Sequence, residues 1–172
     1  MKLEGIAFKF GDDINTDYII PAKRLTSVTV MKEVARYLME DLDPDFVRRI
    51  KPGDLIVAGE NFGCGSSREA APWVIKEAGI GGVVAKSFAR IFFRNAINIG
   101  LPVICANTDT IENGDHLIID LSAGMIRDIE RRCIVKSEQM PPIMVRMLEE
   151  GGIVPFLRKH KGLREIDAGG VS

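Results

Sequence analysis

The residues best suited to chemistry lie in one glycine-rich stretch, residues 59–69, which reads Gly-Glu-Asn-Phe-Gly-Cys-Gly-Ser-Ser-Arg-Glu. The apolar run at 55–59 predicts a buried strand before this stretch, and a helix is predicted after it, from about residue 68 to residue 78. Backbone N–H groups at a helix start are unpaired and carry partial positive charge, so an anion placed there is stabilised. Ser66 and Ser67 fall at this predicted start, with Arg68 next. The pattern therefore indicates an anion-binding loop.

A purely structural role for the two serines also fits these residues. Serine is a favoured helix N-cap, and a carboxylate often follows it within the first turn. Arg68 argues against capping alone, because a cation in the first turn opposes the helix dipole. Such a cation suggests that an anion binds there, and the residues alone leave both interpretations open.

Strands and helices alternate in the part of the chain that must position this loop. The predicted strands are residues 6–10, 18–20, 55–59, 83–85, 102–105 and 116–120, with a hairpin within 125–135. The predicted helices are residues 31–39, 43–50, 68–78, 87–97 (with Ser87 as its cap) and 141–150, and residues 22–30 are predicted to form a loop. The central alternation predicts α/β packing, and the later strands predict a second, β-rich layer. We expect a three-layer α/β domain at residues 1–158, followed by a polar tail at 159–172.

Composition and charge narrow the class of protein. The 172 residues, 46% of them hydrophobic, suit one compact domain. With 23 Lys+Arg against 24 Asp+Glu, the net charge of -1 gives no reason to expect a nucleic-acid partner. No apolar run is long enough to cross a bilayer, and the N-terminus lacks a signal-peptide core. We therefore expect a cytoplasmic protein with no membrane partner.

The candidate metal ligands are few and scattered. Cys64, Cys105 and Cys133 are odd in number and far apart, which argues against a disulfide framework. They contain no C-x-x-C pair, and His116 and His160, the two histidines, are not spaced as paired metal ligands. We expect no metal ion and no cofactor on this chain.

Three motifs occur in one order along the sequence. Residues 11–17 read Gly-Asp-Asp-Ile-Asn-Thr-Asp and are followed by Ile-Ile-Pro at 19–21. The glycine-rich stretch comes second, and residues 85–92, Ala-Lys-Ser-Phe-Ala-Arg-Ile-Phe, come third, followed by Arg94-Asn95 and by Gly-Leu-Pro at 100–102. Together they resemble the swivelling domain of the aconitase superfamily over about residues 3–157. The resemblance implies a β/β/α swivelling domain like the aconitase C-terminal domain, in agreement with the three layers expected above.

A chain this short resembles the separate small subunits of that superfamily. The expected form is the isopropylmalate dehydratase type of leucine biosynthesis, with the small subunits of homoaconitase and of dimethylmalate dehydratase as alternatives. The resemblance implies a hydro-lyase that is active only with a large subunit, and it places the iron–sulfur cluster on that partner. The substrate would be a hydroxy di- or tricarboxylic acid.

The resemblance also assigns roles within the loop. It makes Ser66 the base that, as an alkoxide, takes a proton from the substrate carbon, and it makes Ser67 and Arg68 the groups that hold a substrate carboxylate. A serine hydroxyl is too weak an acid for this role without strong stabilisation of its anion, which a helix start and Arg68 could provide. Arginine suits a carboxylate because its planar fork can make two parallel bonds.

In the resemblance, the segment after Pro21 recognises the substrate. It often reads Tyr-Leu-Arg-Thr in small subunits, whereas this chain has Arg24, Leu25, Thr26 and Ser27, so that Thr26 stands where the arginine would be. Arg24 is close in sequence and could replace that arginine, and Leu25 could face an apolar substituent. We expect this segment to set substrate choice and to become ordered only with partner and substrate.

Two other classes of function remain alternatives. One is a non-catalytic module that binds an anion at the Ser66 loop. The other is a stand-alone phosphate-binding enzyme, which the sequence supports poorly because no Walker-type lysine follows the glycines. The isolated chain is expected to be inactive, and it could self-associate through the surface that awaits its partner.

Overall fold

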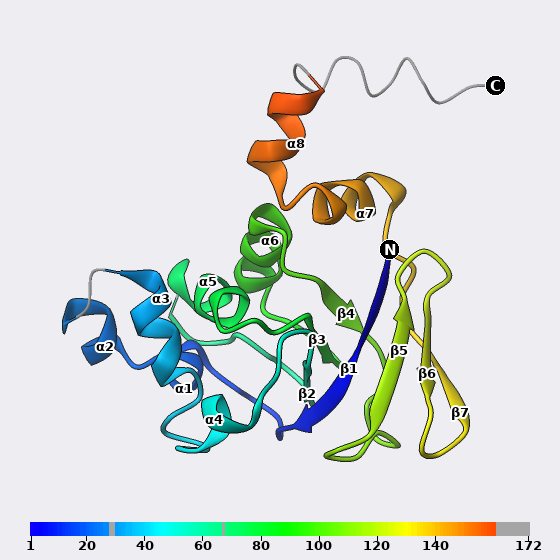
Figure 1. Ribbon diagram of the computed structural model, residues 1–172, viewed down its shortest axis with the longest axis horizontal. Helices are drawn as coiled ribbons and strands as arrows, with labels where there is room; N and C mark the ends of the chain where they lie inside the picture. The colour runs from blue at the N-terminus through cyan, green and yellow to red at the C-terminus, as the bar shows by residue number, and fades with distance from the viewer. Residues whose placement is uncertain (28–29, 67, 161–172) are drawn as a thin grey trace.

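The computed structural model describes residues 1–27, 30–66 and 68–160, in which seven strands form one continuous sheet (Figure 1). Their order across the sheet is β4-β3-β2-β1-β5-β6-β7. The strands are β1 (Lys2–Lys9), β2 (Leu55–Ala58), β3 (Gly82–Ala85), β4 (Val103–Cys105), β5 (His116–Asp120), β6 (Met125–Asp128) and β7 (Cys133–Lys136). Strands β1 to β4 are parallel, whereas β5 pairs antiparallel with β1 and the pairing continues antiparallel to β7. Strand β1 therefore joins a parallel half to an antiparallel half.

The parallel half carries its crossover helices on one face. Helix α5 (Ala70–Glu77) connects β2 to β3, and α6 (Arg90–Ile99) connects β3 to β4. Both crossovers run in the same direction across the sheet. Because crossovers between parallel strands are right-handed, both helices lie on the same face of the sheet. There α5 and α6 contact each other (Figure 1). Every residue of β2 and β3 is buried, as expected for strands covered on both faces.

The antiparallel half is the β-rich part that the sequence predicted. Strands β5 and β6 alternate buried and more exposed residues, which is typical of a sheet with one solvated face. Their inward side chains, Leu117, Ile119 and Ile126, belong to the same hydrophobic core cluster as strands β2 and β3. The two halves of the sheet therefore share one core.

The described residues between β1 and β2 form five short helical segments: α1 (Thr16–Ile19), α2 (Ala22–Ser27), α3 (Met31–Val34), η1 (Ala35–Tyr37) and α4 (Phe46–Arg49). The predicted strand at 18–20 is wrong, because the Asn15 side chain accepts a bond from the backbone N–H of Tyr18 (2.9 Å) and caps α1. The predicted loop at 22–30 is wrong for residues 22–27, which form α2, and residues 28–29 lie outside the described part. Three to six residues are too few to display an apolar period in sequence.

The described part of the chain ends in two helices, α7 (Pro142–Glu149) and α8 (Ile153–Lys159). The first was predicted and the second was not, and α8 crosses the domain boundary expected at residue 158. Phe156 of α8 is fully buried, and Lys76 Nζ on α5 donates to the backbone carbonyls of Ile99 and Gly151. Residues 161–172 of the expected tail lie outside the described part.

Candidate active site

The glycine-rich loop is held in place by main-chain bonds to the segment that follows β1. Asp13 N–H donates to the Glu60 carbonyl (2.8 Å), Gly63 N–H to the Ile14 carbonyl (2.7 Å), and Thr16 N–H to the Cys64 carbonyl (2.9 Å). Asn15 and Cys64 thus form an isolated parallel bridge. The first and second sequence motifs lie side by side because of this pairing.

The third motif holds the other side of the loop. Phe62 N–H donates to the Ser87 carbonyl (3.0 Å), and Ala89 N–H donates to the Phe62 carbonyl (2.9 Å). The Ser87 hydroxyl accepts the N–H of Asn61 (2.8 Å), so its side chain fixes the loop. The prediction that Ser87 caps the following helix is wrong, because α6 begins at Arg90 with Ala89 as its N-cap residue.

Backbone conformation and close packing explain two of the glycines in the loop. Gly63 and Gly65 have φ of 77° and 89°, which favours glycine over other residues. A Cβ on Gly63 would also lie 2.3 Å from the ring of Phe92. That ring packs edge-on against Phe62, at 5.2 Å between centroids. The loop backbone therefore rests directly on an aromatic cluster that includes Phe88.

Ser66 is exposed and makes its polar contacts with Thr16. The buried hydroxyl of Thr16 donates to the Ser66 carbonyl (2.9 Å), and the two hydroxyl oxygens lie 3.3 Å apart. Because the single Thr16 proton is used in the first bond, Ser66 is the donor in the second. Ser67 lies outside the described residues.

The structure corrects the start of the following helix. Helix α5 begins at Ala70, two residues later than predicted, and its N-cap residue is Glu69, which makes no side-chain capping bond. Ser66 lies four residues before the first helical residue, so it does not cap this helix. The capping interpretation is therefore wrong for Ser66, and its hydroxyl has no structural bond other than the contact with Thr16 among the described residues.

Arg68 is anchored by one of its nitrogens. Its Nη1 donates to the Asp17 carboxylate (2.5 Å) and to the Ile20 carbonyl (3.1 Å), and its side chain is 19% exposed. The other guanidinium donors, Nε and Nη2, make no bond to a described residue. The guanidinium is thus oriented by α1 and keeps donors for a planar anion.

Ser66 and Arg68 line one hollow of about 320 Å³ beside the start of α6. Its other lining residues are Gly63, Gly65, Ala89, Arg90, Ile91, Phe92 and Asn95. Arg90 also lies at the same hollow as Ser66. The sequence could have indicated this position, because Arg90 belongs to the third motif. The first residue of a helix that abuts the loop must lie near the loop. The hollow combines one hydroxyl with two guanidinium groups.

The predicted recognition segment forms α2 and contacts other groups. The Arg24 guanidinium makes two bonds to the Glu40 carboxylate (2.8 and 2.9 Å) and lies 3.9 Å from the ring centre of Tyr37. The hydrogen bond to Glu40 raises the pKa of Arg24, and the same bond lowers the pKa of Glu40. The structure therefore ties Arg24 to Glu40 and does not place it among the residues that line the Ser66 hollow.

The remaining residues of this segment stay on α2. Leu25 is partly buried against the hydrophobic core, and the Thr26 hydroxyl donates to the Lys23 carbonyl (3.1 Å). The side chain of Ser27 lies outside the described part. Pro21 begins the segment directly after Ile20, whose carbonyl binds Arg68, so α2 is joined closely to the site.

The cysteines lie in three separate places. Cys64 is in the glycine-rich loop, Cys105 ends β4 and Cys133 begins β7, and β4 and β7 are the opposite edges of the sheet. Burial raises the pKa of the Cys105 thiol, and the nearby Glu138 adds to the effect. Within residues 1–27, 30–66 and 68–160, no three His, Cys, Asp or Glu side chains gather as ligands for a metal ion. In the same ranges, no helix combines the length and apolar character needed to span a bilayer.

Comparison with protein families gives one match, the aconitase C-terminal domain, over residues 22–108. The 3-isopropylmalate dehydratase small subunit 2 of Archaeoglobus fulgidus is 49% identical over 95% of this chain and 99% of its own length. The 3-isopropylmalate dehydratase small subunit of Halothermothrix orenii is 51% identical over 92% and 96%. The isopropylmalate/citramalate isomerase small subunit of Methanocaldococcus jannaschii is 46% identical over 91% and 94%.

A solved structure agrees with these sequences. The crystal structure of 3-isopropylmalate dehydratase from Methanocaldococcus jannaschii superposes with a TM-score of 0.89 and 48% identity, covering 98% of this chain and 100% of the other. The likeness confirms the predicted α/β fold of the aconitase C-terminal type.

Proposed function

Because this chain belongs to the family of aconitase C-terminal domains, we propose that it is the small subunit of a 3-isopropylmalate dehydratase. This enzyme is a two-chain hydro-lyase that interconverts 3- and 2-isopropylmalate in leucine biosynthesis. The observation that carries the proposal is identity of 46–51% to small subunits of this enzyme type over nearly the full length of both chains. The geometry of the Ser66 hollow supports it, because a hydroxyl and two guanidinium groups suit a carboxylate substrate.

The chain's contribution to the reaction is proton transfer and carboxylate binding. Ser66, as an alkoxide, takes the proton from the substrate carbon next to the one that bears the hydroxyl. When water is added back with the hydroxyl on that neighbouring carbon, Ser66 returns the proton to the carbon that first bore the hydroxyl. The guanidinium groups of Arg68 and Arg90 at the same hollow favour the serine anion. Rotation of the Thr16 hydroxyl toward Ser66 would add a hydrogen bond to that anion. Arg68, through its unused donors, and Ser67 hold a substrate carboxylate.

The iron–sulfur cluster belongs to the large subunit in this proposal. The three cysteines of this chain cannot hold a cluster together, since two of them lie on opposite edges of the sheet. The cluster supplies Lewis-acid chemistry at the substrate hydroxyl, and this chain supplies the base. The hollow on this chain is therefore half of an active site that closes against the partner.

The substrate follows from the identity of the relatives and from α2. Arg24, the cation that could favour a tricarboxylate, is paired with Glu40. Leu25 lies on the same helix, where an apolar substituent could be accommodated. Both observations favour isopropylmalate over homoaconitate. The dual name of the Methanocaldococcus jannaschii relative makes citramalate a substrate to test as well.

The test is to purify the chain alone and together with a cluster-bearing large subunit, and to measure hydration of the unsaturated acid. We expect turnover only from the assembled pair, and turnover by the isolated chain would overturn the split active site. Deuterium exchange at the substrate carbon in D₂O separates an enzyme from an anion-binding module. An assembled pair that binds substrate and exchanges no proton would support the module.

A further inference from the structure

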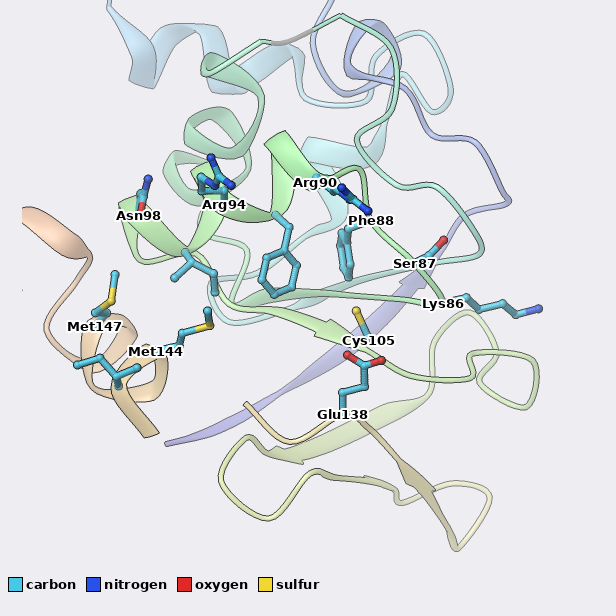
Figure 2. Close-up of a pocket in the computed structure, with 13 residues that line it drawn as sticks. Lys86, Ser87, Phe88, Arg90, Arg94, Asn98, Cys105, Glu138, Met144 and Met147 are labelled. Atoms are coloured by element: carbon cyan, nitrogen blue, oxygen red, sulfur yellow. The ribbon is translucent and has the colours of Figure 1, made fainter. Parts of the chain in front are cut away.

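A second hollow lies on the other side of the α6 start, between α6, α7 and the end of β4 (Figure 2). Its volume is about 570 Å³, which is within the range of small-molecule sites. Its apolar wall is formed by Phe88, Phe93, Ile97, Ile143, Met144 and Met147. Neither Ser66 nor Arg68 lines it. The hollow is therefore distinct from the Ser66 hollow, although Arg90 lines both.

The two ends of this hollow have opposite charge. Arg90 and Arg94 lie at one end, and Glu138 lies beside Cys105 at the other (Figure 2). Lys86, on a third side, is paired with Asp109 (2.5 Å). Neither Arg90 nor Arg94 makes an ion pair or hydrogen bond to a described residue, and both are exposed. The free positive charge of the hollow is thus concentrated on these two guanidinium groups.

The positions of these arginines are unfavourable for the helix itself. Residues four apart lie on the same helix face, so Arg90 and Arg94 repel each other. Arg90 is the first residue of α6, and no acidic residue in the first turn offsets its charge at the positive end of the helix dipole. An anion between the two guanidinium groups would relieve both effects. The charge arrangement at the start of the helix therefore favours a bound anion.

We propose that this hollow binds a small amphipathic monocarboxylate, such as a short aliphatic acid. Its carboxylate lies between Arg90 and Arg94, and its alkyl chain lies against Phe93, Met144 and Met147. Glu138 at the far end repels a second carboxylate, so the hollow discriminates against dicarboxylates. This preference is the opposite of that expected for the Ser66 hollow.

The binding test uses hexanoate and the intact chain with methionines labelled at their methyl carbons. We expect hexanoate to shift the methyl signals of Met144 and Met147 in a saturable way, and to leave those of Met31 and Met125 in place. Hexanol, hexylamine and adipate are matched probes that remove, reverse or duplicate the charge. Hexanol should bind at least about tenfold more weakly than hexanoate, because it lacks the charged hydrogen-bond partner of the arginines. Adipate should also bind at least about tenfold more weakly, because Glu138 repels its second carboxylate.

Two variants make the test specific. Arg94→Gln should weaken hexanoate binding about tenfold, whereas Arg36→Gln, at an exposed arginine that does not line the hollow, should leave it unchanged. Equal shifts with hexanoate, hexanol and hexylamine, or hexanoate binding unchanged by Arg94→Gln, would overturn the proposal. Adding the large subunit should preserve the shifts. Their loss would show that the hollow is a contact for the partner and would also overturn it.

Arg90 lines both hollows, which couples them. This consequence rests on the proposed function, because a bound monocarboxylate would hold the Arg90 guanidinium away from Ser66. In the assembled enzyme, hexanoate should lower kcat at saturating substrate, and Arg94→Gln should relieve the inhibition. Inhibition that high substrate fully reverses would overturn the coupling. The methyl shifts of the isolated chain test the site itself, independently of the dehydratase activity.

Discussion

In the parallel half of the sheet, Ser66 and Arg68 follow the end of β2, and the hydroxyl and guanidinium remain reachable from a hollow. In the antiparallel half, Asp115 and Asp128 are 6% and 0% exposed. The first pair follows a loop held by main-chain bonds, is itself anchored by contacts with Thr16, Asp17 and Ile20, and keeps donors available for a ligand. The second pair is enclosed by its own neighbours. The difference separates polar groups that remain available to a ligand from polar groups that the fold encloses.

The buried pair has a particular protonation pattern. Burial alone would raise the pKa of Asp115, but the Glu112 N–H and the Arg131 guanidinium outweigh it and hold that pKa below its usual value. Burial raises the pKa of Asp128, and the neighbouring Asp115 adds to the effect. Asp128 Oδ2 has no donor among the described residues. If Asp128 carries a proton on Oδ2, this oxygen can donate a hydrogen bond to the Asp115 carboxylate.

The largest expected effect is that of Ser66→Ala. In the assembled enzyme it should lower kcat by at least about 10² to 10⁴, as for the loss of a positioned proton-transfer group. The free energy of unfolding should change by less than about 0.5 kcal/mol, since the exposed Ser66 caps no helix. Steady-state kinetics and urea unfolding followed by Trp73 fluorescence measure the two quantities. Ordinary turnover by the variant would remove Ser66 from the chemistry.

Asp128→Ala should show the reverse pattern. It should lower the free energy of unfolding by about 1–3 kcal/mol, because the Arg131 N–H and Asp115 lose a buried partner. Turnover by the folded enzyme should be unchanged, because Asp128 does not line the Ser66 hollow. A large loss of kcat in this variant would contradict the separation of the two halves.

Asp128→Asn is the matched control and carries the pH dependence. A carboxyl with a raised folded pKa favours folding below its unfolded pKa, and that contribution is lost as pH rises through the folded pKa. Asparagine stays neutral and can still donate to Asp115. The variant and the wild type should therefore have similar free energies of unfolding at acid pH. As the pH rises above the usual aspartate range, the variant should become more stable than the wild type. Urea unfolding over a pH series measures this, and a constant difference across the series would contradict the raised pKa.

Arg68→Lys should have a smaller effect on activity than Ser66→Ala. A lysine gives one point charge in place of a planar fork, so beside the Asp17 and Ile20 bonds it cannot offer a carboxylate two parallel donors. We expect KM to rise about tenfold, with a smaller change in kcat. A fall in kcat comparable to that of Ser66→Ala would mean that Arg68 acts mainly on the serine anion. That result would sharpen the division of roles within the loop.

Arg24→Ala should have the smallest effect on catalysis. Because Arg24 is bound to Glu40 and Tyr37, kcat/KM for isopropylmalate should change less than about threefold. The same measurement with homoaconitate and citramalate shows whether α2 selects the substrate. A strong preference for the tricarboxylate that this substitution abolishes would overturn the choice of isopropylmalate.

The sequence predicted the parts of the fold that have a clear period or a marked end. Buried strands such as β2 and β3 are continuous apolar runs between turn residues, and Gly100 ends α6 with φ of 79°. It did not predict α1, α2 or α8. The first two are too short to show a period, and α8 contains Pro155 and leads into a basic stretch. Tertiary packing, as of the buried Phe156, stabilises such short helices.

The site was predicted from motif order, and its details needed the structure. The three motifs meet because main-chain bonds join residues far apart in sequence, and no local pattern reveals which partner a backbone N–H will find. Local reasoning therefore made Ser87 a cap, although its hydroxyl binds the Asn61 N–H. It also treated Arg24 as an available cation, although Glu40, 16 residues later, binds it.

The backbone bonds around the glycine-rich loop also bear on how such a site can evolve. Asp13, Gly63, Thr16, Phe62 and Ala89 take part through N–H groups that almost any residue possesses. These bonds make part of the loop framework independent of side-chain identity, while the Thr16 and Ser87 hydroxyls also hold the loop. Helix α2 lies immediately beyond this framework, and its Arg24 is held by side-chain contacts with Glu40 and Tyr37. Substitutions on α2 could therefore change these side-chain contacts, one residue at a time, without displacing the main-chain framework around Ser66.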